Sequence, residues 1–312
     1  MHIGMYGFGY WGSGPIFKAL IQNEYIDKIT IYTLSSNPHI GSIPNKHIYF
    51  THNESDILLN NDIKAVIIAT PAHTHYDIAK KTLIAGKHIL VEKPFTLSYN
   101  HAVELLNIAQ NIGLSIMIDY TFIYTESINF IKDYLNSNKL NIISNYDSYR
   151  LSSINNNLNY SIAWDLAIHD ISILYYLGYK YPKTIQAINC SKNENSSDMF
   201  INIQYNNIIA SIHISNFYPE KIRTIYFLGN NKVIKYCDNT QDKLIIYDKS
   251  DCSVTKPILS NTDAVCNMLN YFVNCVKKNI KITDNDAILT PVKILELINK
   301  SLNNNYEVIK YE

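Results

Sequence analysis

The chain has little of what marks several large classes of protein. Its 312 residues include only five cysteines, with no C-x-x-C pair, and only two arginines, Arg150 and Arg223. An odd number of scattered cysteines indicates reduced thiols and gives no sign of a disulfide framework or metal site. No run approaches 18 consecutive apolar residues, so no membrane-spanning helix is expected. Basic and acidic residues balance at 27 each, which disfavours nucleic acid as a partner.

What is present suits an ordinary globular protein. Hydrophobic residues make up 47% of the chain, enough for a full core in one large or two ordinary domains. A strand-like run begins at residue 1 and leaves no room for a signal peptide, so we expect a cytoplasmic protein. Neutral electrostatics favour a small-molecule ligand.

The first distinctive pattern is MHIGMYGFGYWGSGP, in which Gly7, Gly9 and Gly12 form a G-x-G-x-x-G. An apolar, strand-like run precedes it, and residues 15–22 carry apolar side chains at helical spacing. Between a strand and a helix, such glycines allow a sharp turn, close approach of a pyrophosphate and tight helix–strand packing. The alternative is a plain tight turn.

The first 120 residues alternate between strand and helix patterns. Strands are expected near 1–6, 28–32, 64–70, 87–95 and 114–120, and helices near 15–22, 75–86 and 101–113. This βαβ rhythm predicts an α/β class, with a doubly wound parallel sheet of Rossmann type that binds ligands at the carboxyl ends of its strands.

After about residue 120 the rhythm changes. Helices are expected near 126–136 and 163–178 and a strand near 142–150. Six strand-like runs follow between 184 and 248, and helices are expected at 263–278 and 284–302. The sequence therefore predicts a Rossmann domain at 1–118. It predicts an α+β domain with a large, mostly antiparallel open sheet at 119–312.

Three stretches carry chemistry. In VEKPF (91–95), Lys93 follows a parallel strand, and Pro94 restricts its backbone and permits a cis bond. In WDLAIHD (164–170), Asp165 and His169 lie four apart, which on a helix puts a carboxylate beside an imidazole that serves as acid or base. The alternatives are a surface lysine and a structural helix pair.

The third stretch, PAHTHYD (71–77), opens a helix, and His73 and His75 are candidates for contacts with cofactor phosphates. The alternative is a pair of solvated loop residues. No third ligand accompanies the two histidines, so no metal is expected.

The end of the second strand lacks the carboxylate that binds an adenosine ribose in NAD enzymes. Thr33, Ser35 and Ser36 occupy this region, and the two serine hydroxyls are able to bond a 2′-phosphate. The cofactor is thus NAD or NADP, with a slight preference for NADP.

Four ordered motifs, G-F-G-Y-W-G, A-T-P-A-H-T-H, V-E-K-P-F and W-D-L-A-I-H-D, together resemble the Gfo/Idh/MocA family of sugar oxidoreductases. The W-D-L-x-x-H-D and Y-P-E-K-x-R forms look most like the branch that acts on nucleotide sugars in polysaccharide biosynthesis. The resemblance implies a catalytic Lys93 with Asp165 and His169, an active site between two domains, and a homodimer or homotetramer formed through the C-terminal sheet. The implied cofactor-binding residues are Gly7, Phe8, Gly9, Tyr10, Trp11, Gly12, Thr33, Ser35, Ser36, Thr70, Pro71, His73, His75, Glu92 and Lys93.

The chain departs from the family pattern at two places. Ile168 replaces a frequent proline, and Asp119-Tyr120-Thr121-Phe122 replaces a frequent G-H-T-F, which puts Tyr120 near the expected substrate. Further candidates for substrate contacts are Tyr124, Arg150 and Trp164, the arginine because a diphosphate needs a cation. Their alternatives are core aromatics and a surface ion pair, and Arg223 is expected to be structural.

The predicted function is a hydride transfer between NAD(P) and a secondary alcohol or ketone carbon of a sugar, one that carries a nucleotide. His169 or Lys93 is the base, Lys93 stabilises the alkoxide oxygen, and Asp165 orients a hydroxyl or the imidazole. Two alternatives stand beside it. One is reduction of a dihydrodiol, inositol or tetrapyrrole, and the other is a sensor that binds NAD(P) without turnover.

Overall fold

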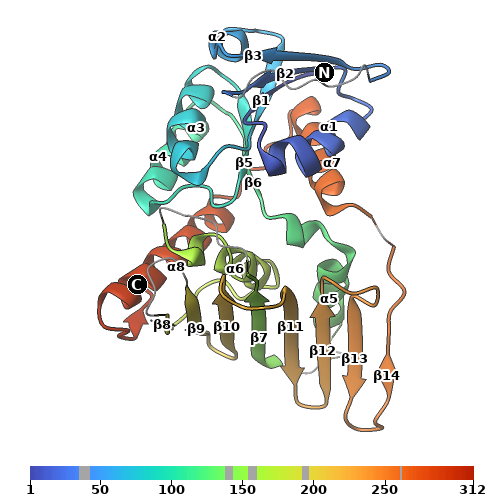
Figure 1. The fold of residues 1–312 in the computed structure, drawn as a ribbon, viewed down its shortest axis with the longest axis vertical. Coiled ribbons are helices and arrows are strands. Elements are labelled where there is room, and N and C mark those ends of the chain that lie inside the picture. The colour runs from blue at the N-terminus through green and yellow to red at the C-terminus, as the bar shows by residue number, and fades with distance from the viewer. Residues whose placement is uncertain (35–42, 138–142, 154–159, 192–196, 261) are drawn as a thin grey trace. The chain divides into compact units, whose positions relative to one another are not determined.

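The computed structural model describes residues 1–34, 43–137, 143–153, 160–191, 197–260 and 262–312. Its contacts divide the chain into two compact units (Figure 1). The first unit comprises Met1–Tyr124 and Thr262–Val292, and the second comprises Thr125–Asn261 and Lys293–Glu312. Among the described residues, no helix combines the length and the apolar character needed to cross a membrane.

The first unit is built on a six-stranded, all-parallel sheet. Its strands lie in the order β3-β2-β1-β4-β5-β6, the doubly wound Rossmann order. Four central strands have apolar runs buried on both faces, as a covered parallel sheet requires. The strands are β1 (His2–Tyr6), β2 (Lys28–Tyr32), β3 (His47–Thr51), β4 (Ile63–Ile68), β5 (His88–Glu92) and β6 (Ile116–Asp119).

Helices cover both faces of this sheet (Figure 1). Helices α3 (His75–Ile84) and α4 (Tyr99–Asn111) pack together and α3 contacts β4 and β5. Helices α1 (Phe17–Gln22) and α7 (Ala264–Lys277) pack together and share a core with β1, β2 and β4. A wide helical turn, Gly12–Ile16, leads into α1, and a short α2 (Ser55–Leu58) follows β3. The sequence patterns did not predict β3 and α2, because β3 is a partly exposed edge strand and α2 is a single turn.

The predicted boundary at 118/119 differs from the observed division. Helix α7 is far along the chain, yet it packs with the first unit because its apolar stripe recurs at helical spacing and is buried there. Asp263 caps this helix by accepting hydrogen bonds from the backbone N–H groups of Val265 and Cys266. The buried stripe consists of Val265, Met268, Leu269, Phe272, Val273 and Val276.

The second unit contains a nine-stranded sheet in the order β14-β13-β12-β11-β7-β10-β9-β8-β15. All its neighbours pair antiparallel except β7 and β10, which are parallel. The predicted fold class, a Rossmann sheet followed by a mostly antiparallel sheet, is confirmed. The strands are β7 (Ile143–Leu151), β8 (Thr184–Asn189), β9 (Asp198–Gln204), β10 (Ile209–Ser215), β11 (Ile222–Gly229), β12 (Lys232–Cys237), β13 (Leu244–Asp248), β14 (Val254–Thr255) and β15 (Ile309–Lys310).

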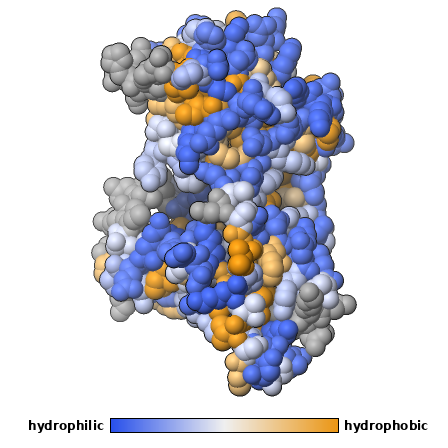
Figure 2. Space-filling model, turned by 90° about the vertical axis from the view of Figure 1, so that its right-hand side faces the viewer, coloured by the Kyte–Doolittle hydropathy of each residue, from blue (hydrophilic) through white to orange (hydrophobic). Residues whose placement is uncertain are grey.

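Three helices accompany this sheet: α5 (Glu126–Asn136), α6 (Ala167–Tyr176) and the second half of α8 (Asn285–Asn303). The single helix predicted near 163–178 is divided into a tight turn, Ile162–Trp164, and α6. Alternate side chains of the central strands stay exposed, among them Tyr149 (39% exposed), Phe200 (41%) and Ile209 (46%). Hydrophobic side chains also reach the surface of this unit on the side where β14 lies (Figure 2).

Candidate cofactor and active site

The three motif glycines take three different conformational roles. Gly7 directly follows β1 with φ +89°, and a Cβ on it would lie 2.4 Å from the Ala69 carbonyl oxygen. A Cβ on Gly12 would lie 2.8 Å from the Gly7 oxygen, so the helix start packs tightly on the strand end. A Cβ on Gly9 would meet nothing within 4 Å. The turn thus has a strained position, a close-packed position and an open position, which fits a dinucleotide pyrophosphate.

The side chains of this turn point in different directions. Phe8 packs edge-to-face on Phe17 and Phe50 beside the core of the first unit. These ring contacts fix the glycine turn to that core. Tyr10 is 92% exposed. The Trp11 indole Nε1–H donates to the carboxylate of Asp119, 3.2 Å away. Of the predicted cofactor residues in this turn, Phe8 therefore serves packing, while Gly9 and Tyr10 face open space.

Thr33 directly follows the last residue of β2. Thr33 is buried, its N–H donates to the Thr51 oxygen, and its own oxygen lies 2.5 Å from Nδ1 of His52. Ser35 and Ser36 lie outside the described residues. The preference for NADP stays a prediction.

The loop after β4 holds the two predicted histidines in contrasting environments. His73 and Pro71 are exposed, and Thr70 receives a hydrogen bond from the Thr74 hydroxyl. His75 is 1% exposed, with Nδ1 2.8 Å from the Pro94 oxygen and Nε2 2.8 Å from the Thr70 oxygen. His75 therefore joins the loop after β4 to the loop that carries Lys93, a structural role and not one of facing phosphates.

The environment of His75 predicts a loss of stability in mild acid. Burial lowers its pKa below the usual value, although carbonyl contacts oppose this effect. In the unfolded chain the imidazole has a pKa of about 6.5. Below that pH the unfolded chain binds a proton that the folded chain does not, so the free energy of unfolding decreases as the pH falls. Burial lowers the pKa of His2 and His88 in the same direction. We expect His75→Gln to weaken this dependence, measured as thermal unfolding at about pH 7.5 and about pH 5.5. An unchanged dependence would contradict the assignment to His75.

Lys93 follows the last residue of β5, at the carboxyl edge of the sheet. The Lys93–Pro94 peptide bond is cis. The backbone N–H of Lys93 donates to Glu92 Oε2 at 3.2 Å. Lys93 thus stands where ligands bind in open α/β sheets, as predicted from its position after a parallel strand.

At the end of β6, Asp119 and Tyr120 are both buried. The Tyr120 hydroxyl is enclosed without a hydrogen-bond partner, and burial raises its pKa. Tyr124 lies 6.1 Å from Tyr271 between ring centroids, and its backbone oxygen accepts from Asn267. Asp119 is not among the predicted site residues, although its place at the end of the sixth parallel strand is a signal for one.

In the second unit, Asp165 precedes α6 and His169 lies in the first turn of that helix. Asp165 has helical backbone angles, so the four-residue spacing is kept although the helix begins at Ala167. The backbone oxygen of His169 accepts from the Ser172 hydroxyl at 2.9 Å. Trp164 is 2% exposed, which favours the alternative of a core aromatic over a substrate contact.

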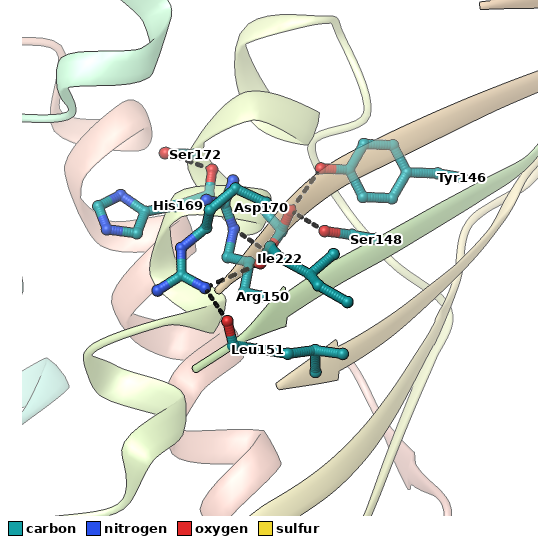
Figure 3. A network of polar contacts seen from close by, with 9 residues as sticks. Tyr146, Ser148, Arg150, Leu151, His169, Asp170, Ser172 and Ile222 are labelled. Carbon is teal, nitrogen blue, oxygen red and sulfur yellow. Dashed lines mark hydrogen bonds and ion pairs between the residues drawn. The ribbon is translucent and has the colours of Figure 1, made fainter. Parts of the chain in front are cut away.

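Arg150 is neither exposed nor a surface ion-pair partner. It is 2% exposed, and its Nε donates to Asp170 Oδ2 at 2.7 Å (Figure 3). Asp170 Oδ1 also accepts from the hydroxyls of Tyr146 at 2.7 Å and Ser148 at 2.6 Å (Figure 3). The three donors alternate along β7 and thus share the face of the sheet that meets α6. Because an ion pair occupies the guanidinium, the structure disfavours the predicted role of Arg150 as a diphosphate ligand.

Arg223 lies opposite Arg150 on the neighbouring strand β11. Its Nη1 donates to the backbone oxygens of Leu151 at 2.8 Å and Ile222 at 2.9 Å. Burial, and then the charge of Arg150, lower the pKa of Arg223. These contacts agree with the structural role expected for it.

No group of three or more His, Cys, Asp or Glu side chains within the described ranges is placed to hold a metal ion. The expectation that the protein works without a metal stays a prediction.

The fold and the glycine turn define the class of protein, one with an NAD-binding Rossmann domain. Residues 1–120 match the family model for the oxidoreductase family with an NAD-binding Rossmann fold, GFO_IDH_MocA. This match confirms the resemblance predicted from the sequence for residues 1–120.

Individual proteins similar to this chain are also oxidoreductases by name. The uncharacterized oxidoreductase YhhX of Escherichia coli is 36% identical over 108 residues, 33% of this chain and 31% of that protein. The UDP-N-acetylglucosamine 3-dehydrogenase of Acidithiobacillus ferrooxidans is 28% identical over 139 residues, 44% of this chain and 43% of that protein. The matches with the two first curated relatives span about a third of those proteins' lengths (36% and 31%).

Solved structures agree in fold over nearly the whole chain. The same Acidithiobacillus ferrooxidans dehydrogenase superposes with a TM-score of 0.80 at 19% identity, over 98% of this chain and 99% of that one. GenD2 from gentamicin A biosynthesis, solved in complex with NAD, superposes with a TM-score of 0.82 at 17% identity, over 100% of this chain and 96% of that one.

Proposed function

We propose that the protein is an NAD(P)-dependent oxidoreductase that transfers a hydride between the nicotinamide and a secondary alcohol or ketone carbon of a sugar. The proposed substrate carries a nucleotide. The observation that carries the proposal is the glycine turn, whose open position at Gly9 fits a dinucleotide. Support for the substrate class comes from relatives named as a UDP-N-acetylglucosamine dehydrogenase and a dTDP-sugar reductase.

In this proposal the bound nicotinamide supplies hydride chemistry and the chain supplies binding, orientation and proton transfer. Lys93 stabilises the negative charge that develops on the reacting oxygen, and His169 or Lys93 exchanges the proton of that oxygen. Asp165 orients a substrate hydroxyl or the imidazole. The second unit is proposed to bind the substrate.

The experiment that tests the function follows absorbance of the reduced nicotinamide with purified protein, NAD or NADP, and a panel of UDP- and dTDP-sugars. Hydride transfer with one of these sugars supports the proposal and shows which cofactor is used. Cofactor binding without transfer to any sugar would favour a non-sugar substrate or a sensor instead.

The glycine turn gives a prediction with an internal control. Gly9→Ala is expected to fold normally, since its Cβ meets nothing within 4 Å, but to bind the cofactor about tenfold or more weakly because the methyl group blocks the pyrophosphate. Gly14→Ala is the matched control, because a Cβ on Gly14 also meets nothing within 4 Å. Calorimetric titration with NAD and NADP measures both. Equal affinities for the two variants would contradict a pyrophosphate at Gly9.

We also propose that the exposed face of the second unit's sheet pairs with a second copy of the chain. Its support is a run of stacked and edge-to-face rings, Phe200 on His213 at 4.1 Å and Tyr149 beside His213 and Tyr226 at 6.4 Å. Apolar faces of this kind mark contacts between proteins. The mass in solution, measured by light scattering, distinguishes a dimer or tetramer from a monomer.

A further inference from the structure

Two carboxyl groups end neighbouring strands of the first unit. Glu92 is the last residue of β5 and Asp119 the last of β6, and they are register partners in the parallel pair. The side chain of Asp119 is almost wholly buried, as is one oxygen of Glu92. Adjacent buried carboxyls do not both ionise readily, because their like charges repel.

The surroundings of Glu92 disfavour the charged form of its carboxyl group. Burial, and then the charge of Asp119 and a hydrogen bond with it, raise the pKa of Glu92 well above its usual range. Asp119 accepts a hydrogen bond at each of its two carboxyl oxygens. Its Oδ1 accepts from the Thr121 hydroxyl and its Oδ2 from the Trp11 indole at 3.2 Å.

The contact with Trp11 connects distant parts of the first unit. Trp11 lies inside the glycine motif, between the open Gly9 and the close-packed Gly12. Strands β4 and β5 separate β1 from β6, so the indole–carboxylate contact runs across the carboxyl ends of these two strands. An indole N–H donates and does not accept, so its direction depends on an acceptor at this place.

We propose that Asp119 is a positioning residue that holds the glycine turn in its dinucleotide-binding shape through the Trp11 indole. The inference rests on the proposed function. Asp119 also forms a hydrogen bond with Glu92, which in turn accepts a hydrogen bond from the backbone N–H of Lys93. Asp119 therefore contacts both the glycine turn and the segment that carries the lysine.

Tryptophan fluorescence tests the contact without cofactor. The chain has two tryptophans, Trp11 at 36% and Trp164 at 2% exposure, and a Trp11→Phe variant gives the Trp164 contribution for subtraction. Asp119→Ala is expected to shift the Trp11 emission to the red and to raise its quenching by acrylamide about twofold. Calorimetry should show NAD(P) binding about tenfold weaker, because the glycine turn loses the hydrogen bond that fixes the position of Trp11.

Two further variants separate positioning from a general structural effect. Asp119→Asn keeps an acceptor oxygen and is expected to restore the Trp11 emission and most of the affinity. Thr121→Val removes the other donor to the same carboxylate and should leave Trp11 emission and affinity within about twofold of wild type.

The outcomes distinguish the two proposals. If wild type binds NAD(P) and Asp119→Ala binds equally well with unchanged Trp11 emission, the positioning role is refuted and the proposed function stands. If wild type binds neither cofactor, the proposed function is refuted first. Red-shifted emission and weaker binding in Asp119→Ala, with rescue by Asp119→Asn, support the positioning role.

Discussion

Lys93→Ala is expected to lower kcat/KM for the proposed hydride transfer about 1,000-fold, because in that proposal the developing charge on the reacting oxygen loses its cation. The lysine follows β5 at the carboxyl edge of the Rossmann sheet, the edge at which ligands bind in this fold. The loss should fall on kcat more than on KM, since the interaction strengthens in the transition state. Steady-state rates with the sugar identified from the substrate panel measure it.

Lys64→Ala is the matched control for Lys93. Lys64 is an exposed lysine on the neighbouring strand β4, so its removal should leave the rate within about twofold of wild type. Lys93→Met keeps the length of the side chain without the charge and is expected to be as inactive as the alanine variant. A Lys93→Ala enzyme with the wild-type rate would exclude this lysine from the chemistry.

Asp170→Ala is expected to give the largest loss of stability, about 3–5 kcal/mol in the free energy of unfolding of the second unit. Asp170 is fully buried in α6, a helix that is apolar on almost every side. Its removal leaves the Arg150 guanidinium, which is also buried, without the carboxylate that balances its charge. The hydroxyls of Tyr146 and Ser148 lose their acceptor as well.

Urea unfolding followed by Trp164 fluorescence in a Trp11→Phe background measures this loss, since Trp164 is buried in the second unit. Asp133→Ala on α5 is the control, because that aspartate is exposed and its removal should change stability by less than about 0.5 kcal/mol. The double variant Arg150→Met with Asp170→Leu should recover part of the stability, because no unbalanced charge stays buried, while the hydroxyls of Tyr146 and Ser148 still lack their acceptor. If Asp170→Ala and Asp133→Ala unfolded at the same urea concentration, the network would not stabilise the unit.

The sequence by itself predicted the alternation of strands and helices in the Rossmann half, apart from the edge strand β3 and the single-turn α2. Continuous apolar runs predict buried strands, helical spacing predicts the helices between them, and the glycine motif falls where β1 meets its helix. The position of Lys93 at a strand end follows from the same patterns. These features depend on neighbours along the chain, which the sequence displays directly.

Tertiary structure alone decided which distant residues meet. Helix α7 belongs to the first unit because its apolar stripe is buried in the core of that unit. In the sequence, the 137 residues 125–261 of the second unit precede it. Arg150 donates a hydrogen bond to Asp170, and Trp11 donates one to Asp119. In each case the two residues lie on elements that are separated in the sequence. The sequence shows which groups need partners, but burial and strand register choose the partners, because a buried charge or donor must be satisfied by whatever the fold brings beside it.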